Sequence, residues 1–281
     1  MLQYEIAGIK LCIDHDSRSS FYKLKKFKSK FSEKPDIYIK FEVSGFFAVQ
    51  NLIIPESDDI AWIPETKENE VSISLYQKSS GRIDYKITSD KRWTNLLLQY
   101  DTRIKDIDES FSALLGNFIM SNKVLFHSGV ILHASSISCC GKGIAFTAPS
   151  GTGKSTHTAM WEKYYNADIL NDDTPILRVE NEQTILYGTP WDGSQNKSIN
   201  SSAPLNALVI IEQAESNSIR ELSNKEAIPL LLPRVFLPYQ NAELMDLALQ
   251  NIEKIIQITP KFLLKCKPDR EAVDLVHQCV L

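Results

Sequence analysis

Polar and apolar positions alternate along much of the first hundred residues of the chain. The alternation covers three segments, IYIKFEV (37–43), VSISLYQ (71–77) and IDYKITSD (83–90). A period of two residues with β-branched and aromatic enrichment predicts strands. The stretch KSSGR (78–82) between the last two segments has turn chemistry, so this pair is predicted to form a hairpin. We expect a small antiparallel sheet in this region, which shows no cluster of catalytic residues.

The pattern becomes helical from about residue 104 to 126. Apolar side chains recur there at steps of three and four residues, at Phe111, Leu114, Leu115, Phe118 and Ile119. One apolar stripe of this kind packs against a neighbouring core. The sequence therefore predicts two domains: a β-rich one over residues 1–103, with a possible role in docking a substrate or partner, and a second over residues 104–281.

Strand and helix patterns alternate in the second domain, which predicts a mixed α/β architecture. The expected strands are 129–135, 143–147, 168–171, 205–213 and 261–267, together with a hairpin over 174–188 that turns at 180–182. The expected helices are the segment THTAMWEKYY (156–165), residues 241–257, and a last helix that Pro268 and Asp269 open and that runs through Val280.

Composition excludes several classes of protein. The 281 residues are 43% hydrophobic and 23% charged, which is ordinary for a globular chain. Their net charge of −4 argues against nucleic-acid binding by a broadly basic surface. Apolar runs such as 207–211 and 230–232 are too short to cross a bilayer. The start MLQYEIAGIKLCID lacks the basic and apolar regions of a signal peptide.

The five cysteines are an odd number without metal-ligand spacing. The adjacent pair Cys139 and Cys140 could form a strained disulfide, but reduced thiols in a cytosolic setting are the favoured interpretation. We therefore expect a cytoplasmic protein.

One segment has a positive net charge, although the chain as a whole is negative. Residues 18–34, RSSFYKLKKFKSKFSEK, carry seven cations interleaved with aromatic residues. One interpretation is a solvated loop or edge strand that lysines keep soluble. The other is a surface that docks an acidic peptide or protein.

The stretch APSGTGKST (148–156) has the pattern of a phosphate-binding loop, with Ala148 where the first glycine usually stands. Small residues let successive backbone N–H groups converge on an anion, Lys154 can reach the β- and γ-phosphates, and Ser155 can ligate Mg²⁺. A strand pattern before the loop and a helix pattern after it favour nucleotide binding over a plain glycine-rich turn. The candidate ATP-binding residues are Ser150, Gly151, Thr152, Gly153, Lys154, Ser155 and Thr156.

Two adjacent carboxylates, Asp172 and Asp173, follow the predicted strand 168–171. One can hold a metal ion while the other accepts the proton of an attacking hydroxyl. Residues 171–175, NDDTP, also suit an ordinary turn. His133 lies on the predicted strand before the loop strand, either as a hydrogen-bonded core residue or as a group near the γ-phosphate.

Four stretches together resemble the catalytic domain of HPr serine kinase/phosphorylase, in the superfamily that includes ATP-dependent phosphoenolpyruvate carboxykinase. They are ILHASSI (131–137), GKGIAFTAPSGTGKSTHTAMW (141–161), ILNDD (169–173) and YGTPWDGS (187–194), and the resemblance covers about residues 125–281. It implies a phosphate-loop core with a mixed sheet, which the small β-rich domain precedes.

By position, the resemblance makes Asp172 the general base and Asp173 the Mg²⁺ ligand. His133 matches the histidine that the family carries near the phosphates. Arg234 matches its phosphate-contacting region loosely, and is equally well a surface arginine before a proline-rich turn.

The sequence also departs from this family. Thr156 stands where HPr kinases usually carry Glu, Ala134 replaces a glycine, and the C-terminal signature linked to dephosphorylation has no counterpart. These differences favour a one-way kinase over a reversible one. Carboxykinases are about twice as long and need a keto-acid site, of which the N-terminal half shows no sign.

The segment 188–204, GTPWDGSQNKSINSSAP, is the candidate substrate loop, because in kinase-like relatives a loop in this region touches the acceptor. Its candidate residues are Trp191, Asp192 and Lys197, and the alternative is an ordinary surface loop with a buried tryptophan anchor.

The prediction is an ATP- and Mg²⁺-dependent kinase of a hydroxyl, with the serine of a peptide or protein, such as a ribosomally made precursor peptide, as the expected acceptor. A small-molecule kinase and a nucleotide-sensing regulator without efficient transfer are the alternatives. Because relatives of the HPr kinase type assemble into rings, a homo-oligomer is also expected.

Overall fold

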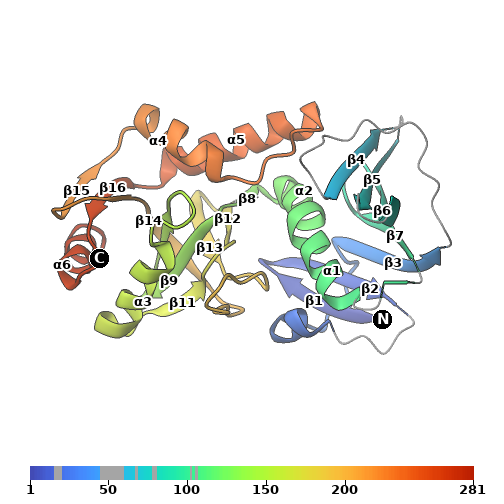
Figure 1. Cartoon of the computed structure of the whole chain (residues 1–281), viewed down its shortest axis with the longest axis horizontal. Helices are drawn as coiled ribbons and strands as arrows, with labels where there is room; N and C mark the ends of the chain where they lie inside the picture. Colours follow the sequence, from blue (N-terminus) through green and yellow to red (C-terminus); the bar gives the residue numbers. More distant parts are fainter. Residues whose placement is uncertain (16–20, 45–59, 67–68, 78–80, 102, 105–106) are drawn as a thin grey trace. The chain divides into compact units, whose positions relative to one another are not determined.

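A computed structural model describes residues 1–15, 21–44, 60–66, 69–77, 81–101, 103–104 and 107–281. The chain divides into two compact units, Met1–Leu115 and Gly116–Leu281. The sequence pattern placed the division between residues 103 and 104. Figure 1 labels the helices and strands of both units.

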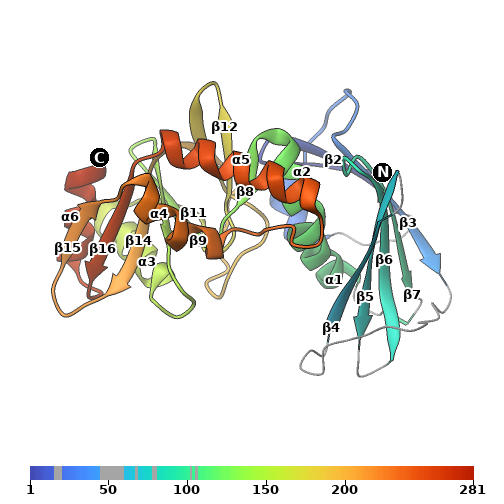
Figure 2. The ribbon, with the colours of Figure 1, turned by 90° about the horizontal axis from the view of Figure 1, so that it is seen from above.

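Unit 1 (Met1–Leu115) contains a seven-stranded sheet in the order β1-β2-β3-β7-β6-β5-β4. Its strands are β1 (Leu2–Ile6), β2 (Ile9–Asp14), β3 (Ile37–Ser44), β4 (Ile60–Thr66), β5 (Glu70–Gln77), β6 (Arg82–Asp90) and β7 (Asn95–Asp101). Strands β3, β5 and β6 confirm the three predicted strands, and β5 pairs with β6 in the antiparallel sense expected of a hairpin. Most of the predicted turn, residues 78–80, lies outside the described residues. Figure 2 shows β4, β5, β6 and β7 side by side.

The sheet of unit 1 is mixed, so the prediction of an antiparallel sheet was wrong. β3 pairs in parallel with β2 on one side and with β7 on the other. Parallel neighbours need a long connection between them. Residues 15–36 connect β2 to β3, and three further strands stand between β3 and β7 in the chain.

Two helical segments belong to unit 1. Of the lysine-rich residues 18–34, expected as a loop or edge strand, residues 22–27 form a 3₁₀-helix, η1 (Tyr22–Phe27), and residues 18–20 lie outside the described residues. The helix α1 (Ile107–Leu114) carries part of the predicted apolar stripe. The ring of Phe111 lies 5.0 Å from that of Phe21 and 4.9 Å from that of Phe41. The apolar side of α1 thus packs within unit 1.

Unit 2 (Gly116–Leu281) contains a nine-stranded mixed sheet with the path β11-β9-β10-β14-β13-β12-β8, and β16 pairs with both β14 and β15. Its strands are β8 (Gly129–Ile131), β9 (Ala134–Cys139), β10 (Lys142–Thr147), β11 (Asp168–Asn171), β12 (Ile176–Glu180), β13 (Gln183–Tyr187), β14 (Ser202–Gln213), β15 (Ser218–Glu221) and β16 (Lys261–Cys266). β14 pairs in parallel with β10 and β16, whereas the other pairs are antiparallel. The chain is therefore a mixed α/β protein.

The helices of unit 2 are α3 (Lys154–Tyr165), α4 (Asn224–Leu231), α5 (Ala242–Ile258) and α6 (Arg270–Val280), with short turns η3 (Val124–His127) and η4 (Leu232–Arg234). They include the three that the sequence predicts, as α3, α5 and α6, and a fourth, α4, that it did not predict. A π-helical stretch η2 (Leu115–Met120) and a short α2 (Ser121–Lys123) complete the segment predicted as one helix. The side chain of Asp269 accepts a hydrogen bond from Ala272 N and caps α6, as the sequence predicted. Within the described part of the chain, no helix combines the length and apolar character needed to cross a membrane.

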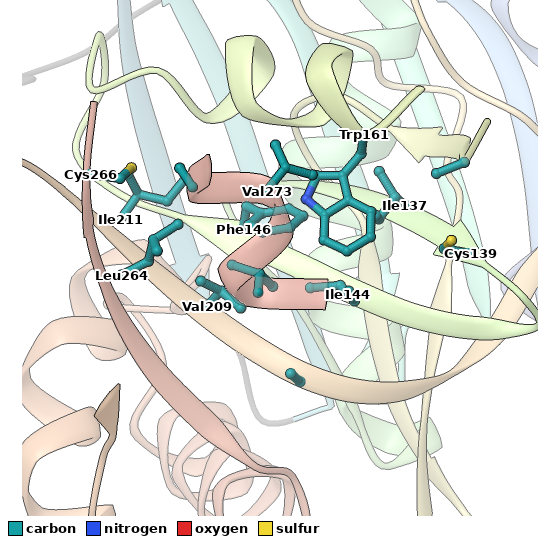
Figure 3. Close-up of a cluster of buried hydrophobic side chains, with 14 of the residues drawn as sticks. Ile137, Cys139, Ile144, Phe146, Trp161, Val209, Ile211, Leu264, Cys266 and Val273 are labelled. Carbon is teal, nitrogen blue, oxygen red and sulfur yellow. The ribbon is translucent and has the colours of Figure 1, made fainter. Parts of the chain in front are cut away.

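The core between the sheet and the helices α3 and α6 is apolar and fully buried. Figure 3 shows the Trp161 indole of α3 over Ile137 and Phe146 of the sheet, with Val273 of α6 beside it. The Phe146 and Trp161 rings lie 6.2 Å apart. Burying such side chains contributes about 2 kcal/mol each, so this packing fixes α3 rigidly on the strands.

Two local features of unit 2 bear on the site. The predicted hairpin is present as β12 and β13, and its two turn residues Asn181 and Glu182 both have positive φ, as a tight hairpin turn requires. The predicted strand 129–135 is instead broken at Leu132 and His133, because β8 pairs with β12 whereas β9 pairs with β10 and β11. His133 therefore lies at a bend between two strands, and its predicted place inside a strand was wrong.

Candidate functional site

Three segments far apart in the sequence meet at one edge of the unit 2 sheet. β9 is antiparallel to both β10 and β11, so β10 and β11 run in the same direction. The residues that follow β10, the residues that follow β11 and the residues that precede β9 must therefore lie at the same edge. These are the glycine-rich loop 148–153, the pair Asp172 and Asp173, and His133.

The glycine-rich loop has the backbone that its sequence predicts. Gly151 and Gly153 adopt φ of 77° and 108°, values that residues with a side chain rarely take. Gly153 is the N-cap of α3 and offers no side chain to the first N–H groups of that helix. A helix start with free N–H groups attracts an anion, because its dipole adds positive charge there.

Lys154 is held at the inner side of this loop. It is 7% exposed, and its Nζ donates to the carbonyl of Ala148 at 3.3 Å. Burial lowers the pKa of Lys154; the nearby Asp173 carboxylate opposes this shift and the Arg234 guanidinium adds to it. Lys154, Asp173 and Arg234 are thus near enough to interact electrostatically.

Asp172 is the enclosed member of the acidic pair. The residue is 2% exposed, and its two carboxylate oxygens accept hydrogen bonds from the backbone N–H groups of Gly193 at 2.7 Å and Gln195 at 2.9 Å. The Asp172 N–H donates to the carbonyl of Lys197 at 3.1 Å. Asp172 therefore binds the candidate substrate loop to the end of β11.

Asp173 is the open member of the pair. Its side chain is 40% exposed, and Oδ1 lies 3.3 Å from Nε2 of His133. The bend at His133 is fixed by its backbone, because its N–H donates to the carbonyl of Arg234 at 2.7 Å. The side chain of Thr147 also donates to the carbonyl of His133 at 2.9 Å. The structure thus brings His133, Asp173 and the backbone of Arg234 together beside the loop.

Asn171 and Thr189 organise the site and were not singled out from the sequence. The Asn171 amide donates to both the carbonyl and the hydroxyl of Thr189 and to the carbonyl of Trp191, and its Oδ1 accepts from the N–H groups of Asp173 and Thr174. The last two bonds make an Asx turn, so the turn interpretation of residues 171–175 describes the backbone that presents the carboxylates. The position of Asn171, directly before an acidic pair, is the signal that points to it.

Three further candidates lie on the loop after β13. The Trp191 indole is half-buried and packs on Gly116, where an added Cβ would come within 2.9 Å of the ring. The Lys197 ammonium pairs with the Glu162 carboxylate of α3 at 2.5 Å. Asp192 is half-exposed on the same loop. Lys197 is thus engaged with α3 here.

A cavity of about 660 Å³ adjoins the loop, α3 and the residues at the ends of β14 and β16. It is lined by Gly151, Thr152, Gly153, Thr156, His157, Met160, Ile211, Gln213, Ala214, Glu215, Cys266, Lys267 and Pro268. The lining mixes apolar side chains with a few polar groups, as small-molecule sites do. The cavity is therefore large enough for the nucleoside part of a nucleotide whose phosphates lie on the loop.

The oxygen groups at this edge suit Mg²⁺. The hydroxyl of Ser155 in the first turn of α3 and the open carboxylate of Asp173 are hard oxygen donors. No cluster of three or more His, Cys, Asp or Glu that could hold a metal by itself occurs among the residues that the structure describes. Mg²⁺ commonly takes one or two protein ligands and completes its coordination shell with phosphate and water.

Comparison with known proteins returned little. No family model matches the sequence, and no curated protein matches it. A solved structure, the HPr(Ser) kinase/phosphatase from Coxiella burnetii, has a TM-score of 0.31 and 15% sequence identity, over 53% of this chain and 89% of the other. At that level of similarity, the neighbour decides neither the fold nor the function of this chain.

Proposed function

We propose that unit 2 is an ATP- and Mg²⁺-dependent phosphotransferase that phosphorylates a hydroxyl, most specifically a serine of a peptide or protein. The observation that carries this proposal is the loop 148–153, with two glycines at positive φ, a helix start without a side-chain cap and a buried Lys154 at its inner side. A plain glycine-rich turn needs no buried lysine. The open carboxylate of Asp173 beside it supplies the second half of a phosphoryl-transfer site.

The loop and Lys154 would hold the triphosphate. Backbone N–H groups of residues 150–155 can donate to phosphate oxygens, apart from that of Thr152, which donates to the carbonyl of Pro149 at 3.3 Å. Lys154 can offset negative charge on the phosphoryl group as it moves. The nucleoside would occupy the 660 Å³ cavity beside the loop, against Met160 and Pro268. Arg234 adds a second cation at the edge.

Ser155 and Asp173 would hold Mg²⁺. The ion, when bound, neutralises phosphate charge and orients the transferring group. His133 Nε2 lies 3.3 Å from Asp173 Oδ1, so the imidazole is in contact with that carboxylate. Asp173, with a side chain that is 40% exposed, would remain accessible to the ion.

Asp172 remains the proposed base. A carboxylate has about four acceptor positions and the amides of Gly193 and Gln195 use two, so one more hydrogen bond from an acceptor hydroxyl is chemically possible. Because Asp172 is 2% exposed, that hydroxyl can reach it only when the loop 193–197 moves aside. Binding of the acceptor to this loop would then uncover the base.

The decisive experiment measures label transfer from γ-labelled ATP to candidate peptide and protein acceptors, with Asp172→Asn and Asp173→Asn compared in parallel. We expect Asp172→Asn to lose at least about 100-fold in transfer rate while nucleotide affinity stays within about threefold. Asp173→Asn should weaken both transfer and the Mg²⁺ dependence of nucleotide binding. If Asp172→Asn transfers label at the wild-type rate, Asp172 is only the anchor of the loop and the base assignment fails.

A second function, a nucleotide-binding regulator without efficient transfer, is favoured by one observation. The proposed base is enclosed, with both oxygens bound to loop amides. For such a regulator, nucleotide would bind and shift the thermal unfolding of unit 2 without label appearing on any acceptor. The same assay therefore separates the two functions.

A further inference from the structure

Unit 1 carries a concentrated positive surface that the phosphotransferase site does not use. We define the lysine surface as Lys23, Lys25, Lys26, Lys28, Lys30 and Lys34. Residues 22–34 hold these six lysines against the single carboxylate of Glu33, a net charge of +5, whereas the whole chain has −4. The remainder of the chain therefore carries −9, and the positive charge is confined to one short segment.

The helix η1, which carries the first lysines of the lysine surface, has one buried apolar face. A 3₁₀-helix has three residues per turn, so side chains three apart lie on one face. Phe21, Leu24 and Phe27 follow this spacing and are 2%, 1% and 0% exposed. Lys25 and Lys26 project from the other faces of η1 and are exposed. The lysines are thus fixed to the core of unit 1, unlike those of a solvated loop.

The second half runs along the edge strand β1. Ser29 N donates to the carbonyl of Gln3 at 3.1 Å, and the Gln3 side chain exchanges hydrogen bonds with the backbone of Phe31. Lys28 and Lys30, two residues apart, line a cavity of about 390 Å³ together with residues 1–4. Two lysines therefore line a recess beside an extended strand, where the Glu5 carboxylate accepts a hydrogen bond from Ser29 Oγ at 3.4 Å.

The positive charge of this surface is largely uncompensated. Glu33 pairs with Lys10, at 3.3 Å. Lys23, Lys25, Lys28, Lys30 and Lys34 form no ion pair with any acidic side chain in the parts of the chain that are described. Several like charges held close together raise each other's energy, and an anionic partner relieves that repulsion.

We propose that the lysine surface docks an acidic peptide segment, and that this segment belongs to the acceptor of the phosphotransferase. The second part rests on the proposed function. All six cations are lysines, which attract an anionic partner as point charges and lack the planar fork with which arginine binds a carboxylate or a phosphate through two hydrogen bonds. A short acidic peptide can contact this segment alone. A long nucleic acid also approaches the remaining residues, whose net charge of −9 repels it.

The test is a binding titration by fluorescence anisotropy without ATP. The probes are a labelled 12-residue peptide of alternating Glu, Ser and Gly, a matched peptide with Gln for Glu, and a single-stranded DNA of about 60 nucleotides, long enough to extend well beyond this segment. We expect the acidic peptide to bind at least tenfold more tightly than the neutral peptide and than the DNA at 0.15 M salt. Equal binding of the two peptides, or tighter binding of the DNA, overturns the proposal.

Matched charge reversals locate the binding surface. The variant Lys25→Glu/Lys28→Glu/Lys30→Glu should lose at least tenfold in affinity for the acidic peptide. The control Lys91→Glu/Lys225→Glu/Lys254→Glu changes the net charge equally at three exposed lysines elsewhere and should lose less than threefold. Equal losses in the two variants would mean that overall charge, and not this surface, attracts the peptide.

A second readout separates this inference from the proposed function. Binding of a fluorescent ATP analogue to the same variants reports on unit 2 alone and should be unchanged in both. Should the peptide bind without any transfer of label to a serine in it, the docking surface stands and the proposed function fails. Should label transfer occur equally in wild type and in the lysine-surface variant, the docking inference fails and the kinase stands.

Discussion

Lysines serve two different regions of this molecule. Lys154 is 7% exposed beside the glycine-rich loop, and burial lowers its pKa. Lys25, Lys28 and Lys30 of the lysine surface are exposed. Water and salt screen an exposed charge, so its attraction for a ligand is weak and several such charges must act together. A charge in a site without water attracts an adjacent ligand group much more strongly. Burial, more than residue type, therefore decides how much one cation contributes to the binding of an anion.

Lys154→Met should produce the largest effect in the molecule. The substitution keeps the length of the side chain and removes the charge that would face the phosphates, so we expect transfer to fall by about 10³-fold. Because burial disfavours the charge, the free energy of unfolding should not fall, and thermal unfolding will show whether unit 2 remains folded. Lys163→Met, at an exposed position of the same helix, is the matched control and should change the rate less than twofold. If Lys154→Met lowers the transfer rate less than tenfold, the buried Lys154 contributes little more than an exposed lysine, and the inferred difference between the two regions is wrong.

His157 offers a second test of what burial does to a cation. It lies in α3 against the ring of Phe146, and burial lowers its pKa to about 4. The unfolded chain takes up the proton near pH 6.5, well before the folded protein does, so stability is complete above pH 6.5 and falls as the pH is lowered toward 4. At pH 5 this linkage costs about 2 kcal/mol.

Urea unfolding at pH 7.5 and pH 5 measures that loss. His157→Gln should remove about 2 kcal/mol of the pH dependence, whatever its effect on stability at pH 7.5. If His157→Gln keeps the full pH dependence of stability, His157 is not the group responsible. The control is His133→Gln, which replaces a half-exposed histidine.

The sequence predicted those parts of the molecule that local chemistry decides. The helix α6 after the Asp269 cap, the β12–β13 hairpin with its turn at Asn181 and Glu182, and the glycines of the loop all follow from a few adjacent residues. Their backbone preferences do not depend on the rest of the fold.

The parts that the sequence did not predict depend on partners far away in the chain. The parallel pairing of β3 with β2 and β7 cannot be read from the alternation of β3, which looks alike in either direction. The break at His133 arises because the strands on its two sides pair with different neighbours. The enclosure of Asp172 requires the amides of Gly193 and Gln195, about twenty residues later. Roles at the site thus depend on contacts that no local pattern encodes.

The smallest expected effect belongs to a single lysine of the lysine surface. Lys25 is exposed and forms no ion pair with any described residue, so Lys25→Ala should weaken binding of the acidic peptide by less than about twofold at 0.15 M salt. Its contribution should grow at 0.05 M salt, because the screening length becomes longer, and anisotropy titrations at the two salt concentrations measure this change. A tenfold loss from this one substitution, unaffected by salt, would place a desolvated contact at Lys25. A single exposed lysine would then contribute as strongly to binding as the buried Lys154 is expected to, and the inferred difference between exposed and buried lysines would be wrong.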